Sequence, residues 1–189
     1  MSFAQEWSAE VLAGAPMIAP ARSFVYPHAV EGEEDAMGRG ALYLMVKPAV
    51  GGSFLATCAL GYRDAGMPTA VFTCPNPTEM CAVAGGYVYI IDTSAPERCT
   101  FLTMRPVVEV RWAYEAGLLL FMGFHTMMAW GRDGLAWETK KLSWEGVRFS
   151  ECDENVVRGF GWDVKSDKEV AFEVDLKTGA HVGGGYNPA

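Results

Sequence analysis

From Gly40 onward, short segments rich in Val, Ile, Tyr, Phe and Trp alternate with clusters of Gly, Pro, Asn and Asp. The breaks recur at intervals of roughly 8–12 residues, which is the spacing of short strands joined by tight turns. Between these breaks the sequence offers no helical segment long enough to connect two parallel strands, and this disfavours an α/β sheet. The pattern therefore predicts an all-β domain built as an antiparallel meander of short strands.

Two segments show the two-residue alternation of a strand that is packed on one face. In YVYII at 87–91 and VVEVR at 107–111, successive side chains point to opposite faces of a sheet. The dipeptides GG at 85–86 and DG at 133–134 supply the positive backbone angles that tight hairpins require. The sequence predicts thirteen strands, over residues 41–47, 53–60, 69–73, 79–84, 87–92, 99–103, 107–112, 117–122, 126–130, 135–139, 146–151, 156–161 and 169–175.

The number of predicted strands limits the architecture. Twisted open sheets of more than about ten strands tend to curl or split, so thirteen strands predict packed or propeller-like sheets. At four strands per blade the chain supplies roughly three blades, fewer than the roughly four of the smallest closed propellers. A propeller closed by one chain is therefore disfavoured, although a dimer would complete one. Two packed sheets and a stack of four-stranded sheets both stay open.

The first 39 residues differ in character from the rest. The sequence predicts one short N-terminal helix, because apolar residues recur there at helical spacing between an N-terminal Ser and a Gly-x-Pro stop. The residues are Ser2, Phe3, Trp7, Val11, Leu12, Gly14 and Pro16. An extended connector follows, with an acidic run at 31–35 that is either a solvated loop or the first turn of a second helix. We therefore predict a helix and connector over 1–39 and a single all-β domain over 40–189.

Charge and composition exclude several classes of partner. Hydrophobic residues make up 50% of the 189-residue chain, enough for a packed core. The net charge of -8 repels phosphate backbones and anionic lipid headgroups, so nucleic acid and membrane surfaces are not expected partners. A protein partner or a second copy of the chain is the expectation that remains.

The compartment is predicted from the cysteines and the chain start. Five cysteines are scattered without a Cys-x-x-Cys pair, a pattern typical of reduced thiols and not of a disulfide framework or zinc site. The first residues carry Glu6 and Glu10 and lack the basic and apolar regions of a signal peptide. The longest apolar run, 117–130, is shorter than the roughly 20 residues of a membrane span. We expect a cytoplasmic protein without a cofactor.

Motifs of common hydrolases, metalloproteases and nucleotide-binding proteins do not occur in the sequence, which leaves catalysis uncertain. His125 stands out because it lies in an apolar run, where an imidazole needs a polar partner. One interpretation is a structural histidine, and the other is a general base paired with Asp133 or Glu145. Metal binding through His28, His125 and His181 would need their convergence in space, and no metal site is predicted from their spacing.

Three tryptophans recur every seven residues, at Trp130, Trp137 and Trp144. Exposed together, they would stack on a sugar ring or anchor a partner protein, and this makes them candidate ligand-binding residues. The alternative is that they fill the core between sheets.

The C-terminal third carries LSWEGV at 142–147, GFGWD at 159–163, FEVDLKTG at 172–179 and GG at 183–184. These segments resemble a family of bacterial β-proteins of unknown function. The resemblance implies a short-stranded fold somewhat like a propeller blade, and it brings no catalytic residues.

The preferred hypothesis is a non-catalytic binding or assembly module that self-associates as a homo-oligomer, since exposed sheet edges favour pairing. The alternative is a hydrolase that acts on a small or sugar-like substrate through His125 with Asp133 or Glu145.

Overall fold

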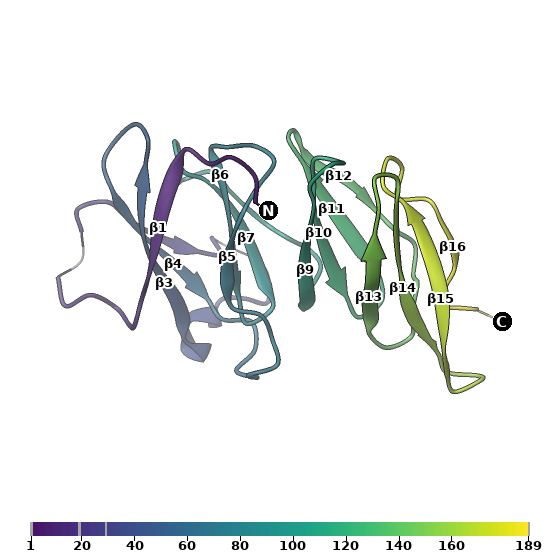
Figure 1. Cartoon of the computed structure of the whole chain (residues 1–189). Helices are drawn as coiled ribbons and strands as arrows, with labels where there is room; N and C mark the ends of the chain where they lie inside the picture. Colours follow the sequence, from purple (N-terminus) through teal and green to yellow (C-terminus); the bar gives the residue numbers. More distant parts are fainter. Residues whose placement is uncertain (1, 19, 29, 189) are drawn as a thin grey trace. The chain divides into compact units, whose positions relative to one another are not determined.

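A computed structural model describes residues 2–18, 20–28 and 30–188, and it confirms the all-β fold class (Figure 1). All thirteen predicted strands are present, with ends displaced by two residues or fewer. The elements are β1 (Trp7–Leu12), β2 (Ser23–Tyr26), η1 (Ala36–Arg39), β3 (Ala41–Pro48), β4 (Phe54–Ala59), β5 (Ala70–Thr73), β6 (Glu79–Ala84), β7 (Tyr87–Asp92), β8 (Cys99–Phe101), β9 (Val107–Ala113), β10 (Leu118–Gly123), β11 (Met127–Gly131), β12 (Gly134–Glu138), β13 (Val147–Cys152), β14 (Val156–Asp163), β15 (Lys168–Asp175) and β16 (His181–Gly183).

The strands form small sheets of four strands each, which we name A to D in chain order. Sheets B, C and D are antiparallel meanders, with strand orders β5-β6-β7-β8, β12-β11-β10-β9 and β13-β14-β15-β16. Sheet A has the order β1-β3-β4-β2, and its edge strand β2 runs parallel to β4. Local hairpin pairing therefore builds three of the sheets, whereas sheet A also needs a chain crossing between its two edges.

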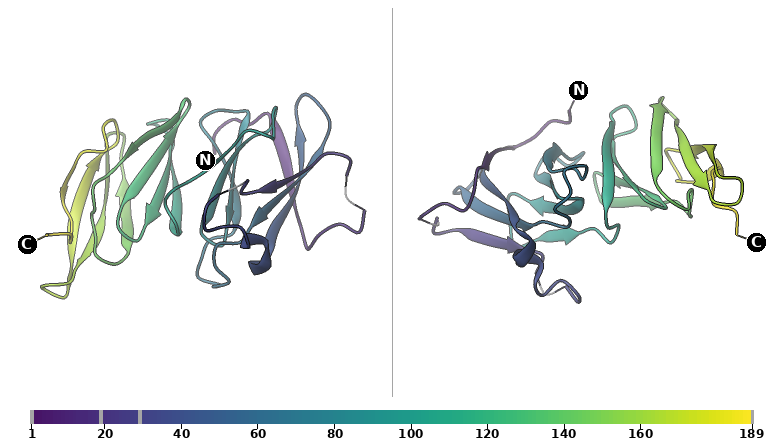
Figure 2. Two further views of the ribbon diagram at one scale, coloured as in Figure 1. Left: turned by 180° about the vertical axis from the view of Figure 1, so that it is seen from behind. Right: turned by 90° about the horizontal axis from the view of Figure 1, so that it is seen from below.

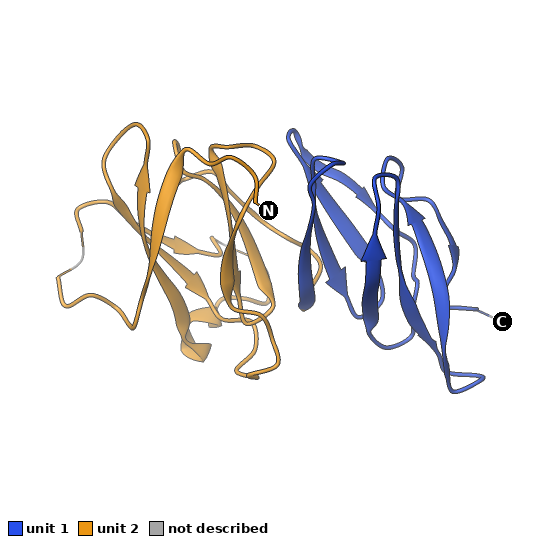
Figure 3. Ribbon diagram, in the orientation of Figure 1, with its two compact units in different colours: residues 1, 107–189 blue, residues 2–106 orange. Residues whose placement is uncertain are grey.

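The chain divides into two compact units (Figure 3). Residues 2–106 hold sheets A and B, and residues 107–188 hold sheets C and D. The boundary that the sequence predicts at 39/40 lies inside sheet A, because β1 and β2 precede it and pair with β3 and β4. Each unit buries its own apolar layer between two sheets.

Strand β1 occupies the segment for which the sequence predicts a helix, so the predicted position of the helix is wrong. The described residues contain one short helical element, the 3-10 turn η1, which follows the acidic run directly. Phe3, Trp7 and Val11 are four residues apart, but they are also all odd-numbered, so both periods place them on one face. The segment is a strand because it pairs with β3 along its whole length. The indole N–H of Trp7 also donates a hydrogen bond to the Glu79 carbonyl at 3.0 Å. No helix among the described residues is long and apolar enough to cross a membrane.

In the first unit, sheets A and B pack face to face through fully buried side chains, among them Leu44 and Phe54 of sheet A and Met80 and Tyr89 of sheet B. The Tyr89 hydroxyl donates to the Ala59 carbonyl at 2.8 Å, which satisfies the polar end of a buried ring. Burial raises the pKa of this hydroxyl above its usual range.

In the second unit, sheets C and D pack through Leu120, Met122, Trp137, Phe172 and Val174. The core residues alternate along β10 and β15, as a two-residue period requires. This unit also carries most of the residues that the sequence singles out for function.

Candidate functional site

His125 lies exposed in the turn between β10 and β11. Its Nδ1 is 3.2 Å from the Ser143 carbonyl oxygen, so this nitrogen carries the proton and donates to the backbone. Asp133 lies exposed in the turn at the other end of β11. Five strand residues between two turns span about 17 Å, so the structure does not bring His125 and Asp133 together.

Glu145 is exposed and lies near His125 through a shared neighbour, Ser143. The backbone N–H of Glu145 donates to Ser143 Oγ at 3.1 Å, while the carbonyl of Ser143 holds the His125 ring. The hydrogen bond described for Glu145 thus uses its backbone and not its carboxylate. Pairing of the Glu145 carboxylate with His125 stays a prediction.

The three candidate tryptophans do not form a stacking wall. Trp130 and Trp137 are 6% and 7% exposed, and the indole N–H of Trp137 donates to the Leu176 carbonyl at 2.7 Å. Trp144 is partly buried, and its ring centroid is 4.6 Å from that of Tyr186. Trp137 packs in the core between sheets C and D on the same face as its partner Ala129, whereas Trp130 points to the opposite face of sheet C, and both rings are almost fully buried.

The structure assembles a different site around His181. A cleft of about 420 Å³ lies between the end of β12 and the turn that joins β15 to β16. It is lined by Glu138, Lys140, Thr178, Gly179, Ala180 and His181. A smaller cleft, of about 260 Å³, shares Ala180 and His181 with the first and includes Glu173 and Asp175. We refer to the larger of the two as the His181 cleft.

One wall of the His181 cleft is a turn that its own side chains hold in place. Asp175 Oδ1 accepts hydrogen bonds from the Thr178 backbone N–H at 2.8 Å and from the Thr178 hydroxyl at 2.7 Å. Gly179 has a φ of +71°, which favours glycine, and a Cβ there would lie 2.8 Å from the Trp137 ring. The buried Trp137 therefore supports the turn from below and fixes the wall of the cleft.

The polar groups of the cleft have distinct charge states. Burial, and next the charge of Lys140, lower the pKa of His181 below its usual value of 6.5. The imidazole is therefore neutral at pH 7 and presents one donor and one acceptor nitrogen. Glu138 accepts a hydrogen bond from the Thr126 hydroxyl at 3.2 Å at the edge of the cleft. Within the described part of the chain, the His181 ring and the Lys140 ammonium have no hydrogen-bond partner.

Sequence reasoning names His181 as a possible metal ligand and misses the other residues of this cleft. Lys140 and His181 are separated by 41 positions, and neither belongs to a motif. The local signal is the DLKTG turn at 175–179, which ends two residues before His181. No group of three or more His, Cys, Asp or Glu side chains within the described ranges is arranged to hold a metal ion.

A second polar cluster, in the first unit, is centred on Glu33. Its Oε1 accepts hydrogen bonds from the Tyr87 hydroxyl at 2.6 Å and from Arg105 at 3.1 Å, and its Oε2 pairs with Arg39. Burial raises the pKa of Glu33, but the Tyr87 and Arg39 hydrogen bonds and the two arginine charges outweigh it and bring the pKa below its usual value. Both carboxylate oxygens are engaged, so we assign this cluster a structural role.

Comparison with known proteins adds no family. No protein-family model matches the chain, and a search of curated proteins finds no match.

Proposed function

We propose that the chain is a non-catalytic binding module that holds a small carboxylate- or phosphate-bearing molecule in the His181 cleft. The observation that carries this proposal is that Lys140 and a neutral His181 line one cleft of about 420 Å³, where none of the described residues forms a hydrogen bond with their side-chain nitrogens. An ammonium attracts an anionic oxygen, and the imidazole N–H adds a directional donor. Glu138 at the edge favours a ligand that also carries a donor group.

Binding is favoured over catalysis by the surroundings of Ser143, the hydroxyl-bearing residue whose carbonyl contacts His125. Ser143 is fully buried, and its Oγ accepts hydrogen bonds from the backbone N–H groups of Glu145 and Trp162. His125 donates to the carbonyl of the same residue, so it is not oriented to remove the hydroxyl proton. The hydrolase alternative would still use His125 and Glu145, but among the described residues no hydrogen bond joins these two side chains.

The proposal also covers the arrangement of the sheets and the location of the protein in the cell. We propose that the sheets are propeller-like, since four-stranded antiparallel sheets are the form of propeller blades and B, C and D each have it. The resemblance of the C-terminal third to bacterial β-proteins of unknown function supports the same assignment. A cytoplasmic location is proposed from the five unpaired cysteines.

The proposal is tested by proton NMR of the three histidine rings during titration with inorganic phosphate and with acetate. We expect a saturable shift of the His181 resonance that is lost in Lys140→Gln and kept in the matched control Lys141→Gln. An unchanged His181 resonance with both anions, or a shift that survives in Lys140→Gln, would overturn the binding site.

The non-catalytic part of the proposal has its own test. We expect the chain to hydrolyse p-nitrophenyl esters no faster than its His125→Asn and His181→Asn variants. A rate that falls in either variant would contradict a purely binding role, and loss in His125→Asn alone would favour the hydrolase alternative.

A further inference from the structure

The C-terminal segment after β16 is anchored by backbone hydrogen bonds. The end of the chain lies beside sheet D (Figure 2). The N–H groups of Gly185 and Tyr186 both donate to the Leu142 carbonyl, at 2.7 and 3.2 Å. Residues 187–188, which follow, are exposed. Among the described residues, Tyr186 is therefore the last one of this tail that a backbone hydrogen bond holds.

Gly185 occupies a space that has no room for a side chain. A Cβ at Gly185 would lie 2.2 Å from the carbonyl carbon of Trp162. A Cβ at Gly161, on the other side of the same crossing, would lie 2.2 Å from the Leu142 carbonyl oxygen. Glycine is needed at both positions, because the backbones approach more closely than any Cβ allows. The tail is therefore fixed at Gly185, and movement is confined to the residues that follow it.

The connection between β12 and β13 forms a fixed wall beside this tail. Leu142 is fully buried, and its N–H donates to the His125 carbonyl at 2.7 Å. The backbone N–H of Trp144 donates to the Trp162 carbonyl at 3.0 Å. Chain ends with few contacts open more readily than segments that are held on both sides. Tyr186 is thus able to leave this wall while Trp144 stays in place.

The ring of Tyr186 contacts the side chains of Trp144 and Lys141. Its centroid is 4.6 Å from that of the Trp144 ring, and the Lys141 ammonium lies 5.1 Å from it. Aromatic contact and cation–π attraction both stabilise a ring in this position. We refer to Trp144 and Lys141 as the Trp144 site. In the folded chain this site is occupied by an aromatic ring of the chain itself.

One polar group of the Trp144 site has no partner. The Nε1 atom of Trp144 is buried, and within the described ranges it forms no hydrogen bond. The indole N–H groups of Trp7 and Trp137, by contrast, donate to backbone carbonyls at 3.0 and 2.7 Å. A buried donor without an acceptor is unfavourable. An occupant that replaced Tyr186 and carried an acceptor would satisfy this N–H.

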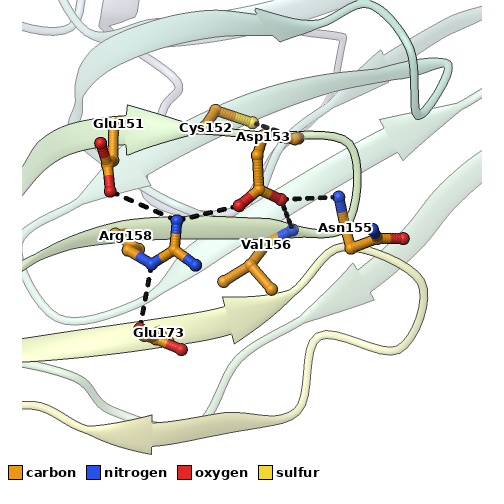
Figure 4. Close-up of polar contacts among 7 residues, drawn as sticks. All are labelled: Glu151, Cys152, Asp153, Asn155, Val156, Arg158 and Glu173. Carbon is orange, nitrogen blue, oxygen red and sulfur yellow. Dashed lines mark hydrogen bonds and ion pairs between the residues drawn. The ribbon is translucent and has the colours of Figure 1, made fainter.

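The ammonium of Lys141 is the second unused group. It forms no ion pair with any residue that the structure describes, and the side chain is exposed. Arg158 on sheet D is the opposite case, because carboxylates already surround it (Figure 4). Its guanidinium lies 2.9 Å from Asp153 and from Glu173 and 3.3 Å from Glu151. An anionic group is therefore attracted to Lys141 and repelled by the carboxylates around Arg158.

We infer that the Trp144 site binds an aromatic carboxylate, which displaces the ring of Tyr186. The ring of the ligand takes the place of the phenol against the Trp144 indole. Its carboxylate accepts a hydrogen bond from the indole N–H and is attracted by the Lys141 ammonium. Tyr186 closes the site when no ligand is bound. This inference adds a second site and does not depend on the His181 cleft.

Proton–nitrogen NMR of the indole N–H groups tests this inference, with 4-hydroxyphenylacetate as the probe. We expect the probe to shift the resonance of the Trp144 indole, which Trp144→Phe identifies. Binding should be at least about tenfold tighter in Tyr186→Ala than in the wild type, because a tail that leaves the site open for about a tenth of the time weakens binding by that factor. An unshifted Trp144 resonance in Tyr186→Ala, or equal affinity in the two chains, would overturn the inference.

Two comparisons test the chemistry of the ligand. Lys141→Gln is expected to weaken binding of the probe, whereas the matched control Lys165→Gln, at an exposed position of the β14–β15 turn, is expected to bind it as the wild type does. Acetate carries the charge without the ring and is expected to leave the Trp144 resonance unchanged. Equal affinity in both lysine variants, or an equal shift with acetate, would contradict an aromatic carboxylate as the ligand.

Fluorine NMR of the wild-type chain labelled with 3-fluorotyrosine follows the tail directly. Tyr186→Phe identifies the Tyr186 resonance, and saturating probe is expected to move it toward its position in the urea-unfolded chain. This measurement decides the matter even if Tyr186→Ala does not fold. A Tyr186 resonance that stays unchanged while the Trp144 indole resonance shifts would overturn the displacement of the ring.

Discussion

The hydroxyl of Tyr87 donates a hydrogen bond of 2.6 Å to Glu33, a residue 54 positions earlier in the chain. This bond joins the acidic run to sheet B, and the guanidinium groups of Arg39 and Arg105 lie 5.3 and 5.8 Å from the centroid of the Tyr87 ring. The sequence predicts the acidic run as a solvated loop or the first turn of a helix. The side chain of Glu33, in this run, is instead bound to residues of the first unit on three sides.

Replacing that carboxylate is expected to destabilise the first unit. Glu33→Gln removes the charge that pairs with two arginines, and its side chain is only 8% exposed, so we expect a loss of about 1–3 kcal/mol in the free energy of unfolding. Urea denaturation measures this loss, with the exposed Glu31→Gln as the matched control.

The same variant has a pH signature with a defined sign. Because the pKa of Glu33 is lowered in the folded chain, its contribution is complete above the usual value of 4.5 and is lost as the pH falls through the lowered pKa. The stability difference between wild type and Glu33→Gln should therefore close in acid. A stability difference that stays constant down to the pH of acid unfolding would argue that the charge of Glu33 does not stabilise the folded chain.

Gly179→Ala is expected to destabilise the second unit more than Gly117→Ala. Both glycines have positive φ, at +71° and +65°, so each substitution strains the backbone by about 1–2 kcal/mol. Only at Gly179 does the added carbon meet the Trp137 ring, and this overlap costs about 1–3 kcal/mol more. Thermal denaturation of the two variants isolates the clash, and equal losses would contradict the packing of Trp137 under the turn.

Lys140→Gln is expected to raise the pKa of His181. Burial lowers this pKa and remains in the variant, whereas the repulsion from the ammonium is removed, so the pKa should move part of the way back toward 6.5. The chemical shift of the imidazole protons as a function of pH measures the change. Lys141→Gln is the control, because Lys141 lies over the Tyr186 ring. Equal titration curves in both variants would place Lys140 outside the cleft.

Arg158→Gln is expected to lower the melting temperature most at low ionic strength. The substitution leaves three carboxylates close together on an exposed face, where salt screens their repulsion. Added sodium chloride should reduce the difference from wild type. The control is Arg98→Gln, which removes an exposed arginine from a pair with a single carboxylate, Asp92. A salt-independent difference would indicate that packing of the arginine stem matters more than its charge.

Thiol reactivity should separate Cys152 from the other cysteines. Cys152 is exposed, whereas Cys58, Cys74 and Cys81 are buried, and burial raises the pKa of each of these three thiols. Burial also raises the pKa of the partly buried Cys99 to about 12, and burial and the charge of Asp153 raise the pKa of Cys152 as well, so exposure separates Cys152 from the other thiols. We expect Ellman's reagent to titrate one thiol rapidly in the folded chain and all five in denaturant. Rapid reaction of Cys58, Cys74 or Cys81 in the folded chain would contradict their burial in the first unit.

The fold could be predicted after Gly40 because local signals agree there. Two-residue alternation, β-branched and aromatic residues, and Gly-containing turns mark the same boundaries, so β6 and β7 are found at their observed limits. The missed strands are all edge strands: β1 and β2 pair with residues about 30 or more positions away, and β16 has three residues. For Trp7 and Val11 the helical and extended periods coincide, so the sequence alone does not distinguish them.

The site could be predicted less well than the fold. His125 is singled out because it lies in an apolar run, and the tryptophans because they recur every seven residues. Neither pattern reports exposure, and Trp130 and Trp137 are buried. His181 and Lys140 lie on different strands and turns, and only tertiary packing places them at one cleft. Residue type thus indicates which side chains can bind or react, whereas only the folded structure shows which of them lie close together.

The strands of sheet A cannot pair in the order in which they are synthesised. β1 and β2 are synthesised before β3 and β4, yet β1 pairs only with β3 and β2 only with β4, and β3 and β4 form a hairpin between them. β1 therefore has no partner strand until residue 48 has been made, and β2 has none until residue 59 has been made. A nascent chain that stalls before that point exposes unpaired, largely apolar strands to chaperones and proteases.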